Sequence, residues 1–478
     1  MKVCVLQPDY TTTDVDYKDY DPPRDLFPLL PGDIVDNVFL NKLSTYRQLK
    51  ELRKNNYDIF VNLCEGYLEW SVPSIDVIYS LDMLNLPYTG PTALLYDPPK
   101  ELMKYVAYTC GVPTPPYVLV KNINQVDEVV SKLSFPLFIK PAKAGDSLGI
   151  DGDSLVTDRH GLEKKLSDIL QDYQEILVEK YIPGREFTVL VAAEVDGKNC
   201  KVYNPLEFVF PEGKKFKTYS LKTSELHEEC NIPCKEDNIS ARLKDSAAKI
   251  FTAFNGVGYA RLDFRLNDNN ELFFLEINFT CSVFYDKGYE GSADYILMHE
   301  PEGKKGFLRK IINEGIARHV RNQKKYIVKG DALSGYGMYA VKGLHEGEVI
   351  YTGEERPHRL VTKKYVEQNW NVDELQSFRK YAWPVSSEVY ILWDNAPAEW
   401  SPQNHSCDPN TEYAGLNVIA IKNIVMGEEL TLDYTTFLNN EMESFICNCG
   451  AENCKRVIQG IQANSITHRE MKRCDGLK

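Results

Sequence analysis

Short apolar runs alternate with helical patterns along the first 320 residues of the chain. Runs of this kind, rich in Val, Ile, Leu and Phe and bounded by turn-forming residues, predict strands. The clearest predicted strands are residues 3–6, 59–63, 137–139, 176–178, 187–192 and 272–277. Strands that alternate with helices in this way are typical of an α/β architecture.

A helical pattern of apolar residues closes this part of the chain. The apolar positions are Phe307, Leu308, Ile311, Ile312, Ile316 and Val320. Their spacing predicts one amphipathic helix over residues 305–321. A polar hinge, 322–325, follows it, and from residue 326 the chain is rich in β-forming residues. We therefore predict domains over 1–95, 96–322 and 326–437, a cysteine-rich segment over 443–460 and a tail over 461–478.

Composition and charge narrow the possible partners. With 478 residues the chain is too long for one core, and 43% hydrophobic and 26% charged residues are typical of a soluble globular protein. No apolar run of about 18 residues is present, so we expect no membrane span. The net charge of −14 disfavours direct nucleic-acid binding and favours small solutes or a basic protein segment, such as a histone-like tail.

The 12 cysteines are too few for a disulfide scaffold, and four of them cluster near the C-terminus. This usage indicates a reducing compartment, either the cytoplasm or the nucleus. His227, Cys230 and Cys234 form a second, looser group, which more often represents ordinary loop residues than a metal site because no fourth ligand is evident.

Two stretches carry the residue types of a nucleotide site. Lys140 follows the predicted strand 137–139 and precedes a Gly/Ser loop containing Ser147, so charge and backbone N–H groups could bind a phosphate. Glu179 and Lys180 end the predicted strand 176–178 and could flank a nucleobase. Each of these residues could equally be a solvated surface charge, and their occurrence together is what favours a site.

Three oxygen-bearing side chains end neighbouring apolar strands: Asp263, Glu276 and Asn278. Hard oxygen ligands of this kind are what Mg²⁺ requires, although acidic residues also cap strands without binding a metal. Beside a phosphate site, they predict a magnesium site.

Taken together, these motifs resemble the ATP-grasp superfamily, and the D-alanine–D-alanine ligases in particular, over roughly residues 1–320. The resemblance implies a pre-ATP-grasp α/β domain followed by an α+β ATP-grasp domain. It implies contacts with ATP for Lys100, Lys140, Ser147, Glu179, Lys180, Ile182 and Glu186, magnesium ligation for Asp263, Glu276 and Asn278, and transition-state stabilisation for Arg261. The implied reaction joins a carboxylate to an amine through an acyl phosphate.

The substrate-binding positions depart from those ligases. Their Gly-Gly, Ser and Glu loop is replaced by the stretch from Gln7 to Thr12, and their His-Gly pair by Cys64-Glu65-Gly66. The run after Asn278 also differs. The nucleotide positions are therefore retained, whereas D-alanine is not implied as the substrate and the small carboxylate or amino-acid substrates stay unnamed.

Near the C-terminus, Cys447, Cys449 and Cys454 follow one another closely, and Cys407 adds a fourth thiol. Four thiolates are the ligand count of a closed structural zinc site. Cys407 lies in the run Asn404-His405-Ser406-Cys407, and Tyr434 ends the run Gly427-Glu428-Glu429-Leu430-Thr431-Leu432-Asp433-Tyr434.

These motifs, in this order, resemble the SET-domain protein-lysine methyltransferases with their post-SET tail. The resemblance implies a mostly-β SET domain over 326–437 and a zinc-binding segment over 443–460. It implies that Tyr434 is the catalytic tyrosine and that S-adenosylmethionine contacts Ser334, Gly335, Tyr336, Gly337, Tyr351, Asn404 and His405. Leu432 stands where the family often has Phe or Tyr, which predicts room for multiple methylation.

The sequence thus predicts an ATP-grasp ligase fused to a SET lysine methyltransferase, with ATP, Mg²⁺, S-adenosylmethionine and Zn²⁺ as cofactors. Its expected partners are a protein lysine and small amino-acid or carboxylate substrates. The alternative is an interaction or scaffold protein in which one or both domains bind their nucleotide cofactor without turnover.

Overall fold

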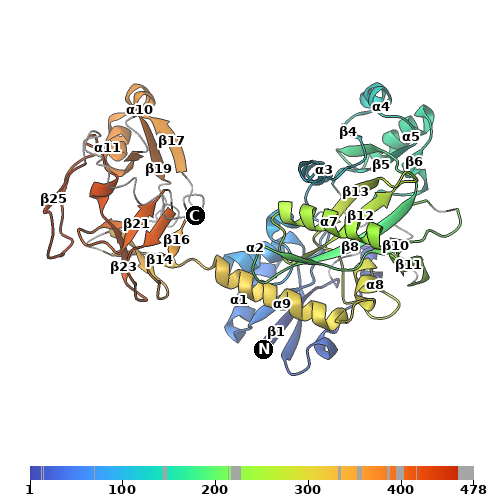
Figure 1. The fold of residues 1–478 in the computed structure, drawn as a ribbon, viewed down its shortest axis with the longest axis horizontal. Helices are drawn as coiled ribbons and strands as arrows, with labels where there is room; N and C mark the ends of the chain where they lie inside the picture. Colours follow the sequence, from blue (N-terminus) through green and yellow to red (C-terminus); the bar gives the residue numbers. More distant parts are fainter. Residues whose placement is uncertain are drawn as a thin grey trace. The chain divides into compact units, whose positions relative to one another are not determined.

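The computed structural model describes residues 1–460 except 12, 14, 69, 144–147, 214, 217–227, 332–334, 353–357, 385–387, 394–402 and 416. The chain divides into two compact units, residues 1–322 and 323–478, and each is described by itself (Figure 1). We call them the first unit and the second unit.

The first unit begins with a parallel three-stranded sheet in the order β2-β1-β3. Its strands and neighbouring helices are β1 Lys2–Pro8, β2 Ile34–Leu40, β3 Ile59–Asn62, α1 Thr45–Leu52 and α2 Ile75–Met83. The next helix in the chain, α3 Lys100–Thr109, packs instead against the larger of the two sheets described next. The apolar side chains of β1 and β3 are buried on both faces, which explains why their sequences read as continuous apolar runs.

Two antiparallel sheets complete the first unit. The smaller has the order β4-β7-β5-β6 and packs with α4 and α5 around one core. Its elements are β4 Tyr117–Val120, β5 Leu137–Pro141, β6 Leu155–Val156, β7 Ile176–Lys180, α4 Val126–Lys132 and α5 Arg159–Ile169.

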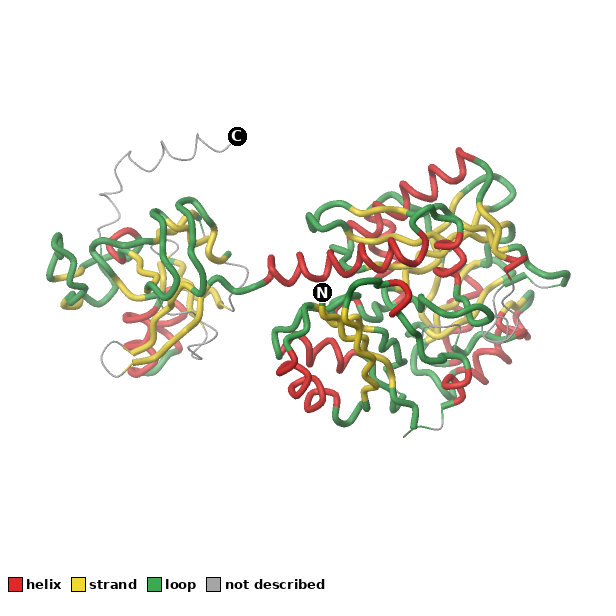
Figure 2. The backbone as a smooth tube through the Cα atoms, turned by 90° about the horizontal axis from the view of Figure 1, so that it is seen from below, coloured by secondary structure: helices red, strands yellow, loops and turns green. Residues whose placement is uncertain are grey.

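The larger sheet has the order β11-β10-β8-β12-β13, with β9 paired to β8. Its strands are β8 Arg185–Ala193, β9 Cys200–Val202, β10 Leu206–Phe208, β11 Asn231–Pro233, β12 Tyr259–Leu266 and β13 Leu272–Asn278. One face packs against α7 Asp237–Ala253, and the other shares a core with β1, β3, α8 Ser292–Met298 and α9 Gly303–Asn322. Helix α9, with which the first unit ends, is the long red helix that leads into the connection to the second unit in Figure 2.

These elements confirm the six strands and the closing helix that we predicted for the first unit. The predicted strands correspond to β1, β3, β5, β7, β8 and β13, and the predicted helix to α9.

The second unit consists mostly of short strands in small sheets, as predicted. The sheets have the orders β14-β15-β23-β20, β16-β22-β21, β17-β19-β18 and β24-β25. The strands are β14 Tyr326–Asp331, β15 Gly335–Ala340, β16 Val349–Tyr351, β17 His358–Thr362, β18 Trp383–Pro384, β19 Val389–Trp393, β20 Asn404–His405, β21 Thr411–Ala414, β22 Asn417–Ala420, β23 Glu429–Leu432, β24 Phe445–Ile446 and β25 Val457–Ile458. Helices α10 Lys363–Asn369 and α11 Val372–Tyr381 pack against the β17–β19 pair.

Candidate functional site

The pairing of β12 with β13 brings the predicted magnesium ligands together. Asp263 lies directly opposite Glu276, and Arg261 directly opposite Asn278. Opposite residues, and residues two apart on one strand, share a face of a sheet. The four side chains therefore lie on one face, where Arg261 Nη2 donates to Asp263 Oδ2 at 3.2 Å. Three oxygen donors in this arrangement fit a hard cation.

A buried carboxylate between two lysines lies next to these strands. Glu179 Oε1 is 2.7 Å from Lys140 Nζ, and Glu179 Oε2 is 2.7 Å from Lys104 Nζ. Burial alone would raise the pKa of Glu179, but the two ammonium groups outweigh it and lower the pKa to about 2. The carboxylate thus stays charged and holds the Lys140 ammonium group in place, with one positive charge left over for an anionic ligand.

A second ion pair occupies the neighbouring strand ends. The Arg265 guanidinium donates to Glu186 Oε2 from Nε at 3.2 Å and from Nη2 at 2.9 Å. It also donates to the Tyr181 hydroxyl at 2.8 Å and to the Ile182 carbonyl at 2.9 Å. Glu186, predicted to contact ATP, is thus bonded within the protein here.

Most of the predicted ATP and magnesium residues line a single pocket, which we call the Glu179 pocket. Its predicted members are Lys140, Glu179, Lys180, Ile182, Glu186, Asp263 and Glu276. Three aromatic side chains also line it, those of Phe138, Tyr181 and Phe216. An apolar pocket with charged groups at one side suits a nucleotide, whose base is flat and whose phosphates are anionic.

A second pocket contains two further predicted residues, Lys100 and Asn278. Lys100, Glu276 and Asn278 line it together with Glu65 and Gly66, and we call it the Glu65 pocket. Glu276 lines both pockets, and Lys100 Nζ lies 4.0 Å from Glu276 Oε2. The two pockets therefore meet at the carboxylate of Glu276.

One predicted ATP contact, Lys180, is bonded to the protein backbone, and three other singled-out residues are not described. The Lys180 ammonium group donates to the backbone carbonyls of Ser134 and Phe135 at 2.9 and 2.8 Å. Ser147, His227 and Ser334 lie outside the described residues.

In the second unit, strand β23 joins the segments that carry the predicted S-adenosylmethionine contacts. It pairs with β15 on one side and with β20 on the other. Asn404 Nδ2 donates to Glu429 Oε1 at 2.7 Å and to the Tyr336 carbonyl at 3.3 Å. There is no room for a side chain at position 337, because a Cβ added to Gly337 would lie 2.5 Å from Glu429 Oε1.

The predicted catalytic tyrosine lies beside His405. The Tyr434 backbone N–H donates to His405 Nδ1 at 3.1 Å, so Nε2 carries the ring proton and faces Cys407 Sγ at 3.3 Å. Burial lowers the pKa of His405, which favours this neutral form. Burial likewise raises the pKa of Tyr434, so its hydroxyl stays protonated.

Gln403 connects two predicted cofactor or catalytic residues. The Tyr434 hydroxyl donates to the Gln403 backbone carbonyl, and the Tyr351 hydroxyl to its side-chain Oε1. Tyr351 is only 1% exposed, so the structure places it in the core of the second unit, behind Gln403.

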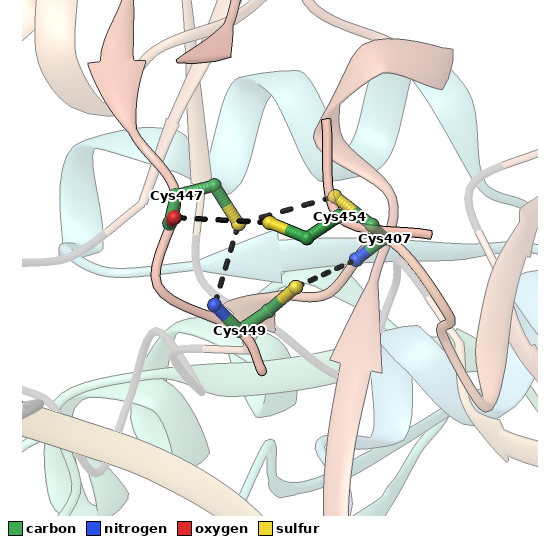
Figure 3. Close-up of side chains that lie close together, drawn as sticks. All are labelled: Cys407, Cys447, Cys449 and Cys454. Carbon is green, nitrogen blue, oxygen red and sulfur yellow. Dashed lines mark hydrogen bonds between the residues drawn. The ribbon is translucent and has the colours of Figure 1, made fainter. Parts of the chain in front are cut away.

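The four cysteines predicted to bind zinc converge on one point (Figure 3). Their Sγ atoms all lie within 4.8 Å of one another, which matches a closed four-thiolate site. The backbone N–H of Cys407 donates to Cys449 Sγ at 3.4 Å, and this bond, together with others from Ala451, Cys447 and Cys454, lowers the pKa of Cys449 to about 6 against the effect of burial. Through the His405 contact of Cys407, this cluster adjoins the Tyr434 site.

Sequence reasoning missed Lys104, Arg265 and Gln403. Lys104 lies four residues after Lys100 on α3, and Arg265 lies two residues after Asp263 on β12. Helical and strand periodicity could have found both of them, because these spacings put side chains on one face. Gln403 acts partly through its backbone carbonyl, for which the sequence carries no signal.

No helix among the described residues is long and apolar enough to cross a membrane.

Comparison with known protein families identifies both parts of the chain. The family model for the D-ala D-ala ligase C-terminus matches residues 106–283, and that for the SET domain matches residues 335–435. Both resemblances derived from the sequence are thereby confirmed.

Curated relatives match part of the chain. A D-alanine–D-alanine ligase of Lactococcus lactis subsp. cremoris (strain MG1363) is 32% identical over 205 residues, which are 41% of this chain and 57% of the relative. D-alanine–D-alanine ligase B of Clostridium tetani (strain Massachusetts / E88) is 30% identical over 271 residues, 51% of this chain and 71% of the relative. The chain thus spans little more than half the length of the first of these.

Among solved structures, the D-alanine–D-alanine ligase from Coxiella burnetii matches with a TM-score of 0.50 at 16% identity. The match covers 68% of this chain and 97% of that chain. This likeness shows that the first unit has the fold of these ligases.

Proposed function

We propose that this chain, which belongs to the D-alanine–D-alanine ligase family and carries a SET domain after its ligase-like part, is an enzyme with two activities. One activity joins a carboxylate to an amine at the expense of ATP. The other transfers a methyl group from S-adenosylmethionine to a lysine of a protein.

For the ligase, we assign the phosphates to Lys100 and Lys140. Mg²⁺ held by Asp263, Glu276 and Asn278 would neutralise phosphate charge. A substrate carboxylate oxygen attacks the γ-phosphorus and ADP leaves; an amine then attacks the acyl carbon and phosphate leaves. The amine loses a proton as the amide bond forms. Positioning and fixed positive charge supply most of the acceleration in such transfers.

The observation that carries this proposal is the convergence of seven predicted residues on the Glu179 pocket. The test is phosphate release from ATP in the presence of a broad panel of amino acids and carboxylic acids. Lys140→Ala should abolish acid-dependent release. Lys132→Ala, which removes a lysine that is 59% exposed, should leave release unchanged and serves as the matched control. Equal release by the wild type and Lys140→Ala would refute the assignment.

For the methyltransferase, we assign orientation of the substrate amine to the Tyr434 hydroxyl. The amine must be deprotonated to attack the sulfonium methyl group, and burial, which keeps Tyr434 and His405 uncharged, favours that form for an amine beside them. We assign S-adenosylmethionine to Asn404, His405 and the stretch around Gly337. Zn²⁺ held by the four thiolates would fix the segment that follows the SET domain.

The hydrogen-bonded connection between Tyr434, His405 and Cys407 carries this second assignment. The test is transfer of a labelled methyl group to mixed basic proteins. Tyr434→Phe should reduce transfer by at least about a hundredfold, because the orienting hydroxyl is lost. Tyr365→Phe, at a tyrosine that is 53% exposed, provides the control. We also propose a Lys-rich protein tail as substrate, since the chain carries a net charge of −14.

One observation favours the rival function, a nucleotide-dependent interaction protein without turnover. Glu179 and Glu186 are both engaged in ion pairs within the protein. Tight ATP binding together with no phosphate release across the whole panel of acids would support this rival for the first unit. We further propose a reducing compartment, the cytoplasm or the nucleus, for both activities, because the four clustered thiols are free and not joined in disulfides.

A further inference from the structure

The loop that follows β3 forms a rigid wall of the Glu65 pocket. The Tyr96 hydroxyl donates to the Gly66 carbonyl at 2.8 Å and to the Cys64 carbonyl at 3.4 Å. Gly66 itself packs so closely that an added Cβ would lie 2.8 Å from the Pro73 carbonyl oxygen. The backbone on either side of Glu65 is therefore held in place, and the Glu65 side chain lines the pocket together with Lys100, Glu276 and Asn278.

Behind this wall lies a buried group with more negative than positive charge. The Arg24 guanidinium, whose side chain is 1% exposed, lies 3.3 Å from Asp21 Oδ1 and 3.3 Å from Glu65 Oε2. It also donates to the Leu63 carbonyl at 2.9 Å and to the Val283 carbonyl at 3.2 Å. Two carboxylates thus share one guanidinium, which leaves one negative charge without a protein counter-charge.

Asp21 and Glu65 are not equally well satisfied. Asp21 accepts hydrogen bonds from the Tyr10 and Tyr285 hydroxyls, each at 2.6 Å, in addition to its ion pair with Arg24. Glu65 has fewer partners: its Oε2 accepts from Arg24, the Ser282 hydroxyl adds a hydrogen bond that lowers the pKa of Glu65, and its Oε1 makes no close hydrogen bond in the described part of the chain. The excess negative charge therefore falls mainly on Glu65.

The electrostatics of Glu65 agree with this geometry. Burial raises the pKa of Glu65 to about 7, with a further contribution from Asp21, while Arg24 opposes the increase. A buried carboxylate whose pKa is raised in this way is stabilised either by a proton or by a cation that enters the pocket.

We propose that Glu65 is a specificity-determining residue that binds the ammonium group of a carboxylate substrate in the Glu65 pocket. The pocket would then select amino acids over carboxylic acids that lack an amine. The inference rests on the proposed ligase activity, because the substrate carboxylate would have to lie near Lys100 and Asn278 on the same pocket.

The test is calorimetric binding to the full chain, with matched pairs of small acids as probes. Each pair consists of an amino acid and the same acid without its amine: alanine with propionate, 4-aminobutyrate with butyrate, and lysine with hexanoate. In the wild type at least one amino acid should bind at least about tenfold more tightly than its partner. Glu65→Gln, which keeps the shape but removes the charge, should reduce that preference to less than about twofold.

Two controls keep the outcome interpretable. Glu65→Asp retains the charge and should retain a weakened preference, and Glu51→Gln, at a carboxylate that is 64% exposed, should match the wild type. Circular dichroism and ATP binding show whether Glu65→Gln is folded. If it is not folded, Glu65→Asp takes its place in the test. A preference for amino acids in Glu65→Asp as strong as that in Glu51→Gln would then overturn the inference. An undiminished preference in folded Glu65→Gln overturns it too, as does the lack of any preference in the wild type.

Phosphate release from ATP, measured in parallel with the same acids, separates this inference from the proposed ligase function. Selective amine binding that depends on Glu65, without any phosphate release, would overturn the ligase activity alone. Phosphate release with no preference for the amino acids would overturn the role of Glu65 alone.

Discussion

Replacing Glu179 by glutamine tests the charged centre of the Glu179 pocket. In the wild type this carboxylate lies 2.7 Å from each of two ammonium groups, those of Lys104 and Lys140. Glutamine keeps the size of the side chain but leaves both lysines buried without a counter-charge. Removal of one partner from a buried ion pair is among the most destabilising single changes. We therefore expect Glu179→Gln to destabilise the first unit.

The magnitude follows from the pKa of Glu179. The two lysines, acting against burial, lower it from 4.5 to about 2. Since one pKa unit corresponds to about 1.4 kcal/mol, the charged carboxylate contributes about 3 kcal/mol to the free energy of unfolding. The side chain is only 4% exposed, so solvent screens it little. This agrees with the roughly 3–5 kcal/mol measured when buried pairs are broken.

The sign of the pH dependence is fixed by the lower pKa in the folded state. The stabilisation is fully present above pH 4.5 and is lost as the pH falls toward 2, because the carboxylate then takes up a proton in both states. The difference between wild type and Glu179→Gln should accordingly be constant near neutral pH and shrink in acid.

The assay is urea unfolding followed by far-UV circular dichroism from about pH 7 to about pH 3. Glu51→Gln, which removes an exposed carboxylate, should leave the urea midpoint unchanged at each pH. A difference below about 1 kcal/mol at neutral pH, or one that stays constant down to pH 3, would refute this account of the Lys104–Glu179–Lys140 group.

Three further predictions concern the second unit. Cys449→Ser should lower the zinc content from about one per chain and abolish methyl transfer while ATP binding persists; elemental analysis that finds no zinc in active wild type would contradict it. Gly337→Ala should weaken S-adenosylmethionine binding by about tenfold, as measured by calorimetry, because the new Cβ would displace Glu429 Oε1 and its bond to Asn404; unchanged affinity would contradict it. Leu432 is smaller than the Phe or Tyr often found at this position in the family, so the enzyme should form di- and trimethyl-lysine. Mass spectrometry that detects only monomethyl-lysine would contradict this prediction.

The sequence predicted the first unit well because central strands such as β1, β3 and β8 are buried on both faces. Residues 3–6 of β1 and 189–193 of β8 are apolar without interruption, and such a run can be recognised without knowing its partner strand. The register of β12 with β13, which sets Asp263 opposite Glu276, depends on pairing and could only be inferred from the resemblance. The second unit was less predictable from periodicity alone, since strands such as β20 have two residues and form through pairing with β23.

The sequence predicted which residues belong to the candidate site. It did not predict which of their side chains form ion pairs and hydrogen bonds with one another. The sequence gives no signal that Arg24, more than 200 residues from Val283, would donate to its carbonyl. Contacts of this range arise from the packing of whole elements, and local patterns do not encode them. For the same reason the shared charge of Asp21 and Glu65 became visible only in the structure.

The central claim is that one chain contains two independent active sites. The most direct measurement assays acid-dependent phosphate release and methyl transfer on single preparations of wild type, Lys140→Ala and Tyr434→Phe. Lys140→Ala should lose phosphate release and keep methyl transfer, and Tyr434→Phe should show the reverse. Loss of both activities in either folded variant, or retention of both in both variants, would contradict the claim.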